Sequence, residues 1–259
     1  MTIVFFDPLK QPGWDNPNLK PALFPQALNS VDDLLYSPYL INAGELLLMC
    51  ALWDGPRDHD LLLCEVQPAG TSFWIRLYDT YFETAPTAPS VAVKIPLSVL
   101  AHGSFGLRFK VRSGDDGDYR NFSQESRMDL DFYAPYQDVA GSTQPPEADY
   151  PAELPAGVDI NQATLDTNPG GFNFVIRSHI AWAAGDAITG IWFSTVAPLG
   201  SEPSLDSLPL DAVPTTFNLP VRAFEGLPNG FYRFYYQLTD FAGNKSLISV
   251  ALSGRNFQR

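Results

Sequence analysis

Six aspartates in two short acidic stretches are the residues best suited to hold a metal ion: Asp54, Asp58, Asp60, Asp115, Asp116 and Asp118. Carboxylate oxygens are the ligands that Ca²⁺ prefers. Aspartates in turns also commonly bond their own backbone. Arg120 would occupy a ligand position if the second stretch were an EF-hand loop, and no helical pattern flanks it. Solvated turns are therefore the favoured interpretation, and calcium is the alternative.

The three histidines, His59, His102 and His179, are the candidates for acid–base chemistry. None lies in a known catalytic pattern, because the chain has no Gly-x-Ser-x-Gly, no His-Glu-x-x-His and no phosphate-binding glycine loop. Catalytic triads can also assemble from distant residues. A hydrolase with a site at a domain junction is thus kept as an alternative to the favoured prediction, a protein without catalytic residues or cofactors.

A basic stripe alternates with apolar residues in the segment LRFKVR, where Arg108, Lys110 and Arg112 are predicted to point outward. Such a stripe could bind an acidic ligand. Asp129 and Asp131 fall on the outward face of the returning strand, and opposite charges on neighbouring strands commonly pair. Ordinary cross-strand pairing is the favoured interpretation.

An aromatic run, FYRFYY, gives the second candidate for binding. If Phe234 and Tyr236 point inward, Tyr235 points outward and could stack on a sugar ring. Outward aromatic residues are also common in strands without any ligand. Tyr235 is therefore the candidate residue for a carbohydrate-binding surface, and an ordinary outward position on a strand is the favoured interpretation.

The two cysteines, Cys50 and Cys64, lie in the apolar runs LLLMCALW and LLLCEV. Both are predicted to be buried free thiols that pack as small apolar side chains. A disulfide would require the two strands to bring both Cβ atoms close together, which the sequence does not decide.

The segments that must position these residues read as short β-strands. No long stretch repeats apolar residues with helical spacing, while 23 prolines and 19 glycines divide the chain into short aromatic-rich runs. Alternation predicts two closing hairpins whose inward residues are Leu107, Phe109, Val111, Met128, Leu130 and Phe132 in the first, and Phe234, Tyr236, Leu238, Ile248, Val250 and Leu252 in the second.

The two halves share an order of motifs. Gly44-Glu45 and Gly185-Asp186 each open an apolar run, and Ile95-Pro96-Leu97 matches Leu219-Pro220-Val221. A stretch rich in proline and alanine separates the halves. We therefore expect two all-β domains, 1–136 and 137–259, with residues 137–153 as a linker.

GDAITGIW and LTDFAGNKS, both in the second half, resemble the immunoglobulin-like repeats of large bacterial surface-associated and secreted proteins. The first half matches them loosely, with SGDDGD in place of the Ala-Gly-Asn turn. The resemblance implies two immunoglobulin-like β-sandwiches in tandem and a non-catalytic role.

One strand departs from the expected alternation, since residues 46–53 are apolar on both faces. One face belongs to the core. The segment before Pro38, with six large apolar residues, is predicted to wrap over the other.

The net charge of −13 excludes the basic surfaces that bind nucleic acid or anionic membranes. The N-terminus lacks the basic and apolar regions of a signal peptide, so the expected location is the cytoplasm, with signal-independent export as the alternative. Recognition of another protein, as an adhesion or accessory module, is the predicted function. A carbohydrate-binding module and the hydrolase are the alternatives.

Overall fold

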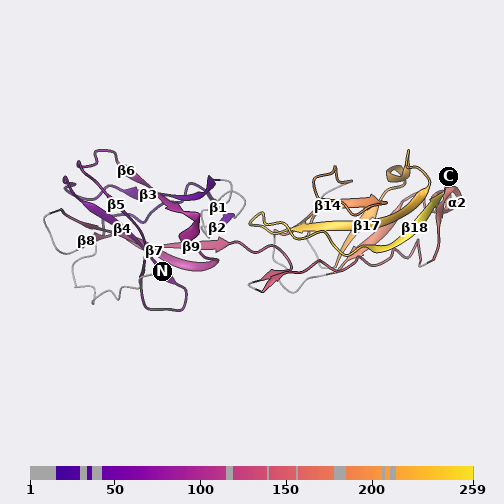
Figure 1. The fold of residues 1–259 in the computed structure, drawn as a ribbon, viewed down its shortest axis with the longest axis horizontal. Helices are drawn as coiled ribbons and strands as arrows, with labels where there is room; N and C mark the ends of the chain where they lie inside the picture. The colour runs from indigo at the N-terminus through magenta and orange to yellow at the C-terminus, as the bar shows by residue number, and fades with distance from the viewer. Residues whose placement is uncertain are drawn as a thin grey trace. The chain divides into compact units, whose positions relative to one another are not determined.

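The computed structural model describes residues 16–29, 34–36, 43–114, 119–138, 140–155, 157–177, 185–205, 208–210 and 214–258. The chain divides into two compact units, Met1–Phe132 and Tyr133–Arg259, each built almost wholly from strands (Figure 1). No helix in the described part of the chain is long and apolar enough to cross a membrane.

The large sheet of the first unit has the order β1-β2-β9-β7-β4-β5, and β8 also pairs with β7. The smaller sheet pairs β3 with β6, and a 3₁₀ turn, η1, follows β6. The bounds are β1 Ala27–Asn29, β2 Leu34–Tyr36, β3 Glu45–Ala51, β4 Leu61–Pro68, β5 Ile75–Tyr81, β6 Ser90–Pro96, η1 Leu97–Val99, β7 Gly103–Arg112, β8 Arg120–Phe122 and β9 Ser126–Asp131.

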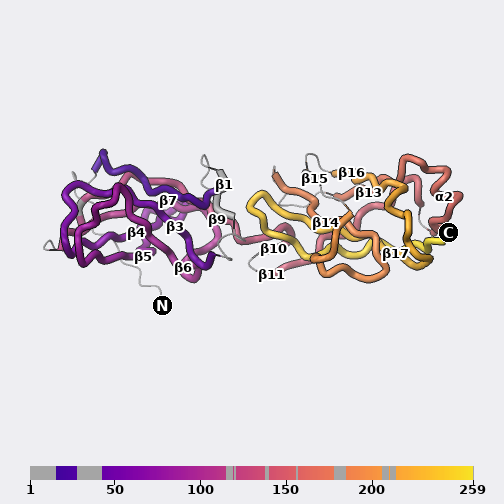
Figure 2. Tube along the Cα trace, turned by 90° about the horizontal axis from the view of Figure 1, so that it is seen from above, coloured from indigo at the N-terminus to yellow at the C-terminus, as the bar shows by residue number. Residues whose placement is uncertain are grey.

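The second unit repeats this plan, with one sheet in the order β12-β18-β17-β14-β15. The other sheet pairs β13 with β16, which lie side by side (Figure 2). The bounds are β10 Gln137–Asp138, β11 Gly141–Ser142, β12 Ile160–Asn161, α2 Gln162–Thr167, β13 Phe172–Ile176, β14 Ala187–Ser194, β15 Leu208–Pro209, β16 Thr215–Leu219, η2 Val221–Phe224, β17 Gly230–Thr239 and β18 Leu252–Gln258.

Each unit is an immunoglobulin-like sandwich. In both, a central strand (β7 or β17) lies between an antiparallel neighbour from earlier in the chain and the last strand of the unit. In both, a short strand runs parallel to that last strand, β2 beside β9 and β12 beside β18. This arrangement of two sheets matches the immunoglobulin plan. The prediction of two all-β immunoglobulin-like sandwiches in tandem is confirmed.

The predicted inward residues form the two cores, with two exceptions. Leu107, Phe109 and Val111 are buried in the first core, and both cysteines are buried there without a bridge, as predicted. In the second core the exceptions are Val250, which is exposed, and Ile248, which is half-buried and lies outside the core cluster. The chain between Asn244 and Ala251 is not a regular strand, so alternation does not hold there.

The match of Gly44-Glu45 to Gly185-Asp186 is wrong. The first pair opens β3, which belongs to the smaller sheet, whereas the second opens β14, which pairs with the central strand β17. The counterpart of β14 is β4, which pairs with β7. The two Φ-Pro-Φ segments do occupy equivalent places, because Pro96 and Pro220 each precede a 3₁₀ turn after the edge strand of the smaller sheet.

The segment predicted as a linker packs on the second unit. Ala148 is buried in its core, and Pro145 accepts a hydrogen bond from the Val250 amide. The carbonyl of Pro146 accepts one from the hydroxyl of Tyr236 at 2.8 Å. Residues 145–149 thus form part of the sandwich.

The N-terminal segment contributes to the first core. Leu19, Ala22 and Phe24 are buried there, and Leu23 forms a β-bridge with Met49 on the edge of β3. The outer face of β3 is only half-buried. Residues 16–26 therefore line the edge of this strand instead of wrapping its second face, and residues 1–15 lie outside the described residues.

A serine completes the hydrogen bonding of each central strand. The Phe109 amide donates to Ser123 Oγ, and the Ser123 amide donates to the Phe109 carbonyl. Tyr236 and Ser249 make the same two bonds. Both serines are buried, so their hydroxyls satisfy amides that water does not reach.

We expect Ser123→Ala and Ser249→Ala each to lower the free energy of unfolding by about 1–3 kcal/mol, because a buried amide loses its acceptor. Chemical denaturation measures the change, and the exposed Ser142 gives the control, Ser142→Ala, with an expected effect within about 0.5 kcal/mol. Equal effects from all three substitutions would contradict the assignment.

Candidate functional site

The basic stripe predicted from the sequence is not exposed to solvent at Arg108 and Lys110. Arg108 and Lys110 lie on the outer face of the large sheet, as their parity predicts, but both are buried. Each forms an ion pair with buried Glu65 on β4: Arg108 Nη2 lies 2.8 Å from Oε2, and Lys110 Nζ lies 2.7 Å from Oε1. The predicted exposure of these two residues is wrong, and neither is accessible to an acidic ligand.

Aromatic rings cover the buried charges. The Arg108 guanidinium lies 4.0 Å from the ring centroid of Trp74 and 4.9 Å from that of Phe122. The Lys110 ammonium lies 4.9 Å from the ring centroid of Tyr119. A cation over an aromatic face is stabilised by the ring quadrupole, most strongly where water is excluded.

Arg112 ends the stripe and is only half-buried. Its guanidinium lies 5.8 Å from the ring centroid of Tyr119. Burial raises the pKa of Tyr119, and the positive charges of Arg112 and Arg76 oppose this increase. Arg108, Lys110 and Arg112 therefore form one row of cations, and each lies close to an aromatic ring.

The predicted cross-strand partners of the stripe are also wrong. Asp129 pairs with Arg127 at 2.7 Å, and Asp131 lies beside His102. The reason is the register: β9 pairs with residues 103–107 of β7, so its aspartates do not reach Arg108 or Lys110.

The accessible site of the first unit is the edge strand β5 and the cavity beside it. β5 pairs antiparallel with β4 and is the last strand of its sheet, and no described strand pairs with its other edge. In the β4–β5 ladder Cys64 pairs with Tyr78, and the next residue of β4, Glu65, pairs with Arg76. Leu77, between the two β5 residues, is therefore an extra residue without a partner on β4. Such bulges bend a strand and turn a side chain to a new direction.

A cavity of about 500 Å³ opens here into the core. Leu77 lines it together with the following residues: Val66, Ile75, Arg76, Ser98, Val99, Leu100, Ala101, Phe105, Met128 and Leu130. Met128 and Leu130 are buried core residues, whereas Val99 is exposed. The cavity thus has an apolar floor and an open rim.

Arg76 is the one charged residue of this lining. Its guanidinium lies 2.5 Å from Asp79 Oδ1, and both side chains are more than a third exposed. The hydrogen bond with Asp79 raises the pKa of Arg76 above its ordinary value. An exposed pair of this kind contributes little to stability, so these two charges are free to exchange partners.

The acidic stretches have separate structural roles where they are described. Asp60 is fully buried, and its Oδ2 accepts hydrogen bonds from Trp53 Nε1 at 2.7 Å and from the Arg57 amide at 2.9 Å. Asp58 accepts from the Ala85 amide, and Asp54 accepts from Asn16.

Over the described ranges, no three acidic, histidine or cysteine side chains group as metal ligands. Asp115, Asp116 and Asp118 lie outside the described residues, so at the second stretch a solvated turn stays the favoured prediction and calcium the alternative.

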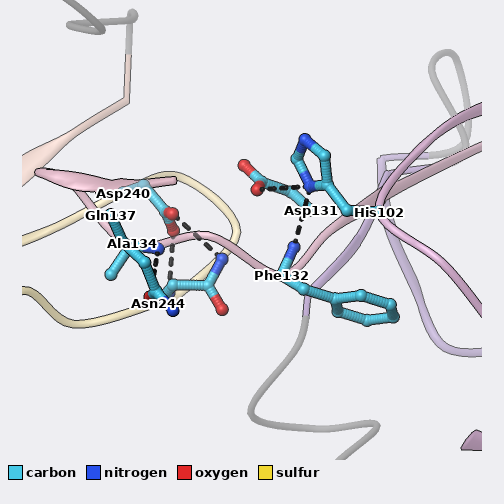
Figure 3. Close-up of polar contacts among 7 residues, drawn as sticks. All are labelled: His102, Asp131, Phe132, Ala134, Gln137, Asp240 and Asn244. Carbon is cyan, nitrogen blue, oxygen red and sulfur yellow. Dashed lines mark hydrogen bonds and ion pairs between the residues drawn. The ribbon is translucent and has the colours of Figure 1, made fainter. Parts of the chain in front are cut away.

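Two histidines make defined contacts. His59 has a positive φ of 67°, and its Nδ1 lies 2.5 Å from the hydroxyl of Tyr81 on β5. His102 Nδ1 accepts from the Phe132 amide at 3.2 Å and lies 3.4 Å from Asp131 Oδ1 (Figure 3). The Phe132 amide thus occupies Nδ1 of His102. His179 lies outside the described residues.

The predicted outward aromatic, Tyr235, is buried. It lies opposite Trp192 of β14, whose Nε1 donates to the Glu202 carbonyl at 3.4 Å. The segment that carries Glu202 thus lies beside this face of the sheet, and neither ring is open for stacking. The exposed aromatics Phe73 and Tyr81 stand at opposite ends of β5, and Phe231 and Phe241 stand at opposite ends of β17, so neither pair makes a platform for a sugar.

No family model matches the sequence, and no curated protein matches it. Among solved structures, the FN1–FN3 domains of chicken CNTN1 are similar with a TM-score of 0.42 and 11% identity, over 94% of this chain and 68% of that one. So remote a likeness adds nothing to the argument, and the assignment of the fold rests on strand order and register.

We expect Glu65→Gln to lower the free energy of unfolding by about 3–5 kcal/mol, because it removes the buried carboxylate that pairs with both Arg108 and Lys110. The matched control, Asp79→Asn, breaks the exposed pair with Arg76 and should cost at most about 1 kcal/mol. Urea denaturation monitored by tryptophan fluorescence measures both. A Glu65→Gln loss no larger than that of Asp79→Asn would show that the buried network does not stabilise the unit.

Proposed function

We propose that the protein is a non-enzymatic recognition module and that its first unit binds an extended segment of a partner polypeptide along β5. The observation that carries this proposal is the edge of β5, which has no described strand partner, next to a cavity that residues 75–77 of the same strand help to line. Strand addition uses both features: backbone hydrogen bonds supply affinity, and pockets for alternate side chains supply specificity.

The dimensions of the site support a peptide ligand. β5 has seven residues, enough to pair with a short extended segment. A cavity of about 500 Å³ has room for a large apolar side chain such as leucine or phenylalanine. Arg76 at the rim suits an acidic residue near that anchor, since its present carboxylate partner, Asp79, is exposed.

The two units offer less support to the alternatives. A sugar site would need adjacent exposed aromatic rings, and Tyr235 and Trp192 are buried. A hydrolase would need a histidine with a free nitrogen beside a hydroxyl nucleophile. His102 uses Nδ1 to accept the Phe132 amide, and the hydroxyl nearest His59 Nδ1 is the phenol of Tyr81.

A peptide library displayed on phage tests the proposal. Ser98 is exposed on the cavity lining, so Ser98→Trp should fill the cavity while the core stays intact. We expect selected peptides to carry a large apolar residue. Their affinity for Ser98→Trp should be at least about tenfold lower than for the wild type, because the apolar side chain can no longer be buried in the cavity. The matched control is Ala152→Trp, at an exposed position of the second unit.

Amide chemical-shift changes on peptide binding should concentrate in β5 and residues 98–101. Peptides that shift other strands instead, or that bind Ser98→Trp as well as the wild type, would place recognition elsewhere on the molecule.

A further inference from the structure

The bulge at Leu77 places two opposite charges of β5 on one face of the sheet. Arg76 pairs with Glu65, and Asp79 pairs with Leu63. Glu65 and Leu63 are two residues apart on β4, so they share a face, and the β5 residues opposite them share it too. In a regular strand, residues 76 and 79 would lie on opposite faces. The extra residue therefore allows the exposed ion pair between Arg76 and Asp79.

The other residues in the middle of β5 lie on the core side of the sheet. Ile75, Tyr78 and Thr80 pair with buried core residues of β4, and Leu77 lines the cavity. All four are only half-buried. No described strand pairs with the free edge of β5. This edge thus has an outer face that carries one positive and one negative charge, and an inner face of mostly apolar residues.

We propose that the free edge of β5 pairs antiparallel with β5 of a second copy of this chain, so that the two large sheets join into one. The twofold axis of this dimer passes between Leu77 and Tyr78. Arg76 of each copy then lies opposite Asp79 of the other, and Leu77 lies opposite Tyr78. The inference rests on the proposed function, because it names a second copy as the partner polypeptide of the same edge.

Charge complementarity supports a second copy as the occupant. A twofold interface brings the same patch of both molecules together, so the patch must complement itself. β5 meets this requirement, because each exposed pair within a strand is exchanged for pairs between the strands, at both symmetry-related positions. The exchange costs little, since an exposed pair contributes little to the stability of the single chain.

The faces of the strand select the same register. Paired residues of neighbouring strands must lie on the same side of a sheet. With the axis between Leu77 and Tyr78, outer residues meet outer residues and inner residues meet inner ones. With the axis on Leu77, Arg76 would lie opposite Tyr78, and with the axis on Tyr78 it would lie opposite Thr80. Both shifts set an outer residue against an inner one.

Aromatic residues extend the match at the ends of the strand. Trp74, which precedes β5, lies opposite Tyr81 of the second copy in this register. Trp74 is half-buried and Tyr81 is exposed. Aromatic pairs across strands stabilise a sheet. On the inner face, Tyr78 of the second copy lies next to Leu77 and hence beside the cavity.

The net charge of −13 opposes the approach of two copies. Salt at about 0.15 M screens charges that are more than about 8 Å apart, whereas Arg76 and Asp79 would be in contact across the dimer. One short strand from each copy makes a small interface. We therefore expect a reversible dimer with a Kd of roughly 10–100 µM.

Sedimentation velocity of the full chain at increasing concentration in about 0.15 M salt tests the proposal. Arg76→Asp and Asp79→Arg should each weaken the dimer at least about tenfold, because each sets like charges opposite one another at both symmetry-related positions. An equimolar mixture of the two variants should associate as the wild type does, since every charge again meets its opposite. This recovery also shows that both variants are folded. The double variant should dimerise alone.

Amide chemical shifts should change with protein concentration in β5, and the peptides selected on phage should dissociate the dimer, because they compete for one edge. Peptides that bind β5 of a chain that stays monomeric up to about 500 µM, well above the expected Kd, would overturn the dimer and leave the proposed function intact. Failure of both the dimer and the peptides would reject both proposals. A dimer that Arg76→Asp does not weaken, or a mixture of the single variants that stays monomeric, contradicts the register and with it the inference.

Discussion

The central strand of each large sheet is buried on both faces, and the rest of each unit is arranged to make that possible. A strand in this position must satisfy its backbone and fill two layers of side chains. On the inner face, Phe109 and Tyr236 pack between the sheets. Their amides donate hydrogen bonds to the hydroxyls of Ser123 and Ser249, which lie in the segments that follow the central strands, where the regular strand pairing is interrupted. The same backbone problem is thus solved in the same way in both units.

The outer faces of the two large sheets are covered in two chemically different ways at equivalent positions. Since Phe109 and Tyr236 correspond, Arg108 takes the place of Tyr235, and its neighbour Glu65 takes the place of Trp192. The first unit therefore buries an ion pair where the second buries two aromatic rings. A buried ion pair must recover the cost of desolvation, and an apolar pair of similar volume often stabilises as well or better. In the first unit Lys110 and the rings of Trp74 and Phe122 help to recover that cost.

This comparison explains what the sequence could and could not predict. Alternation placed Leu107, Phe109 and Val111 correctly in the core, because the period of a strand is a local property. It also placed Arg108 and Tyr235 correctly on the outer face. It wrongly took that face to be exposed, because the covering residues come from elsewhere in the chain. The aromatics near Phe122 were the available signal, since rings close to an alternating basic stripe suit cation–π cover.

The edge strand β5 could not have been found from its sequence, because its role depends on the bulge opposite Cys64 and Glu65. Without the extra residue, Leu77 would face a residue of β4 in the ladder. With it, Leu77 turns toward the cavity, while Arg76 lies opposite Glu65. Cys64 and Glu65 are consecutive, so Cys64 lies in the core and Glu65 pairs with the buried cations. One irregularity in the β4–β5 ladder therefore lies next to the buried charge network and the proposed docking edge.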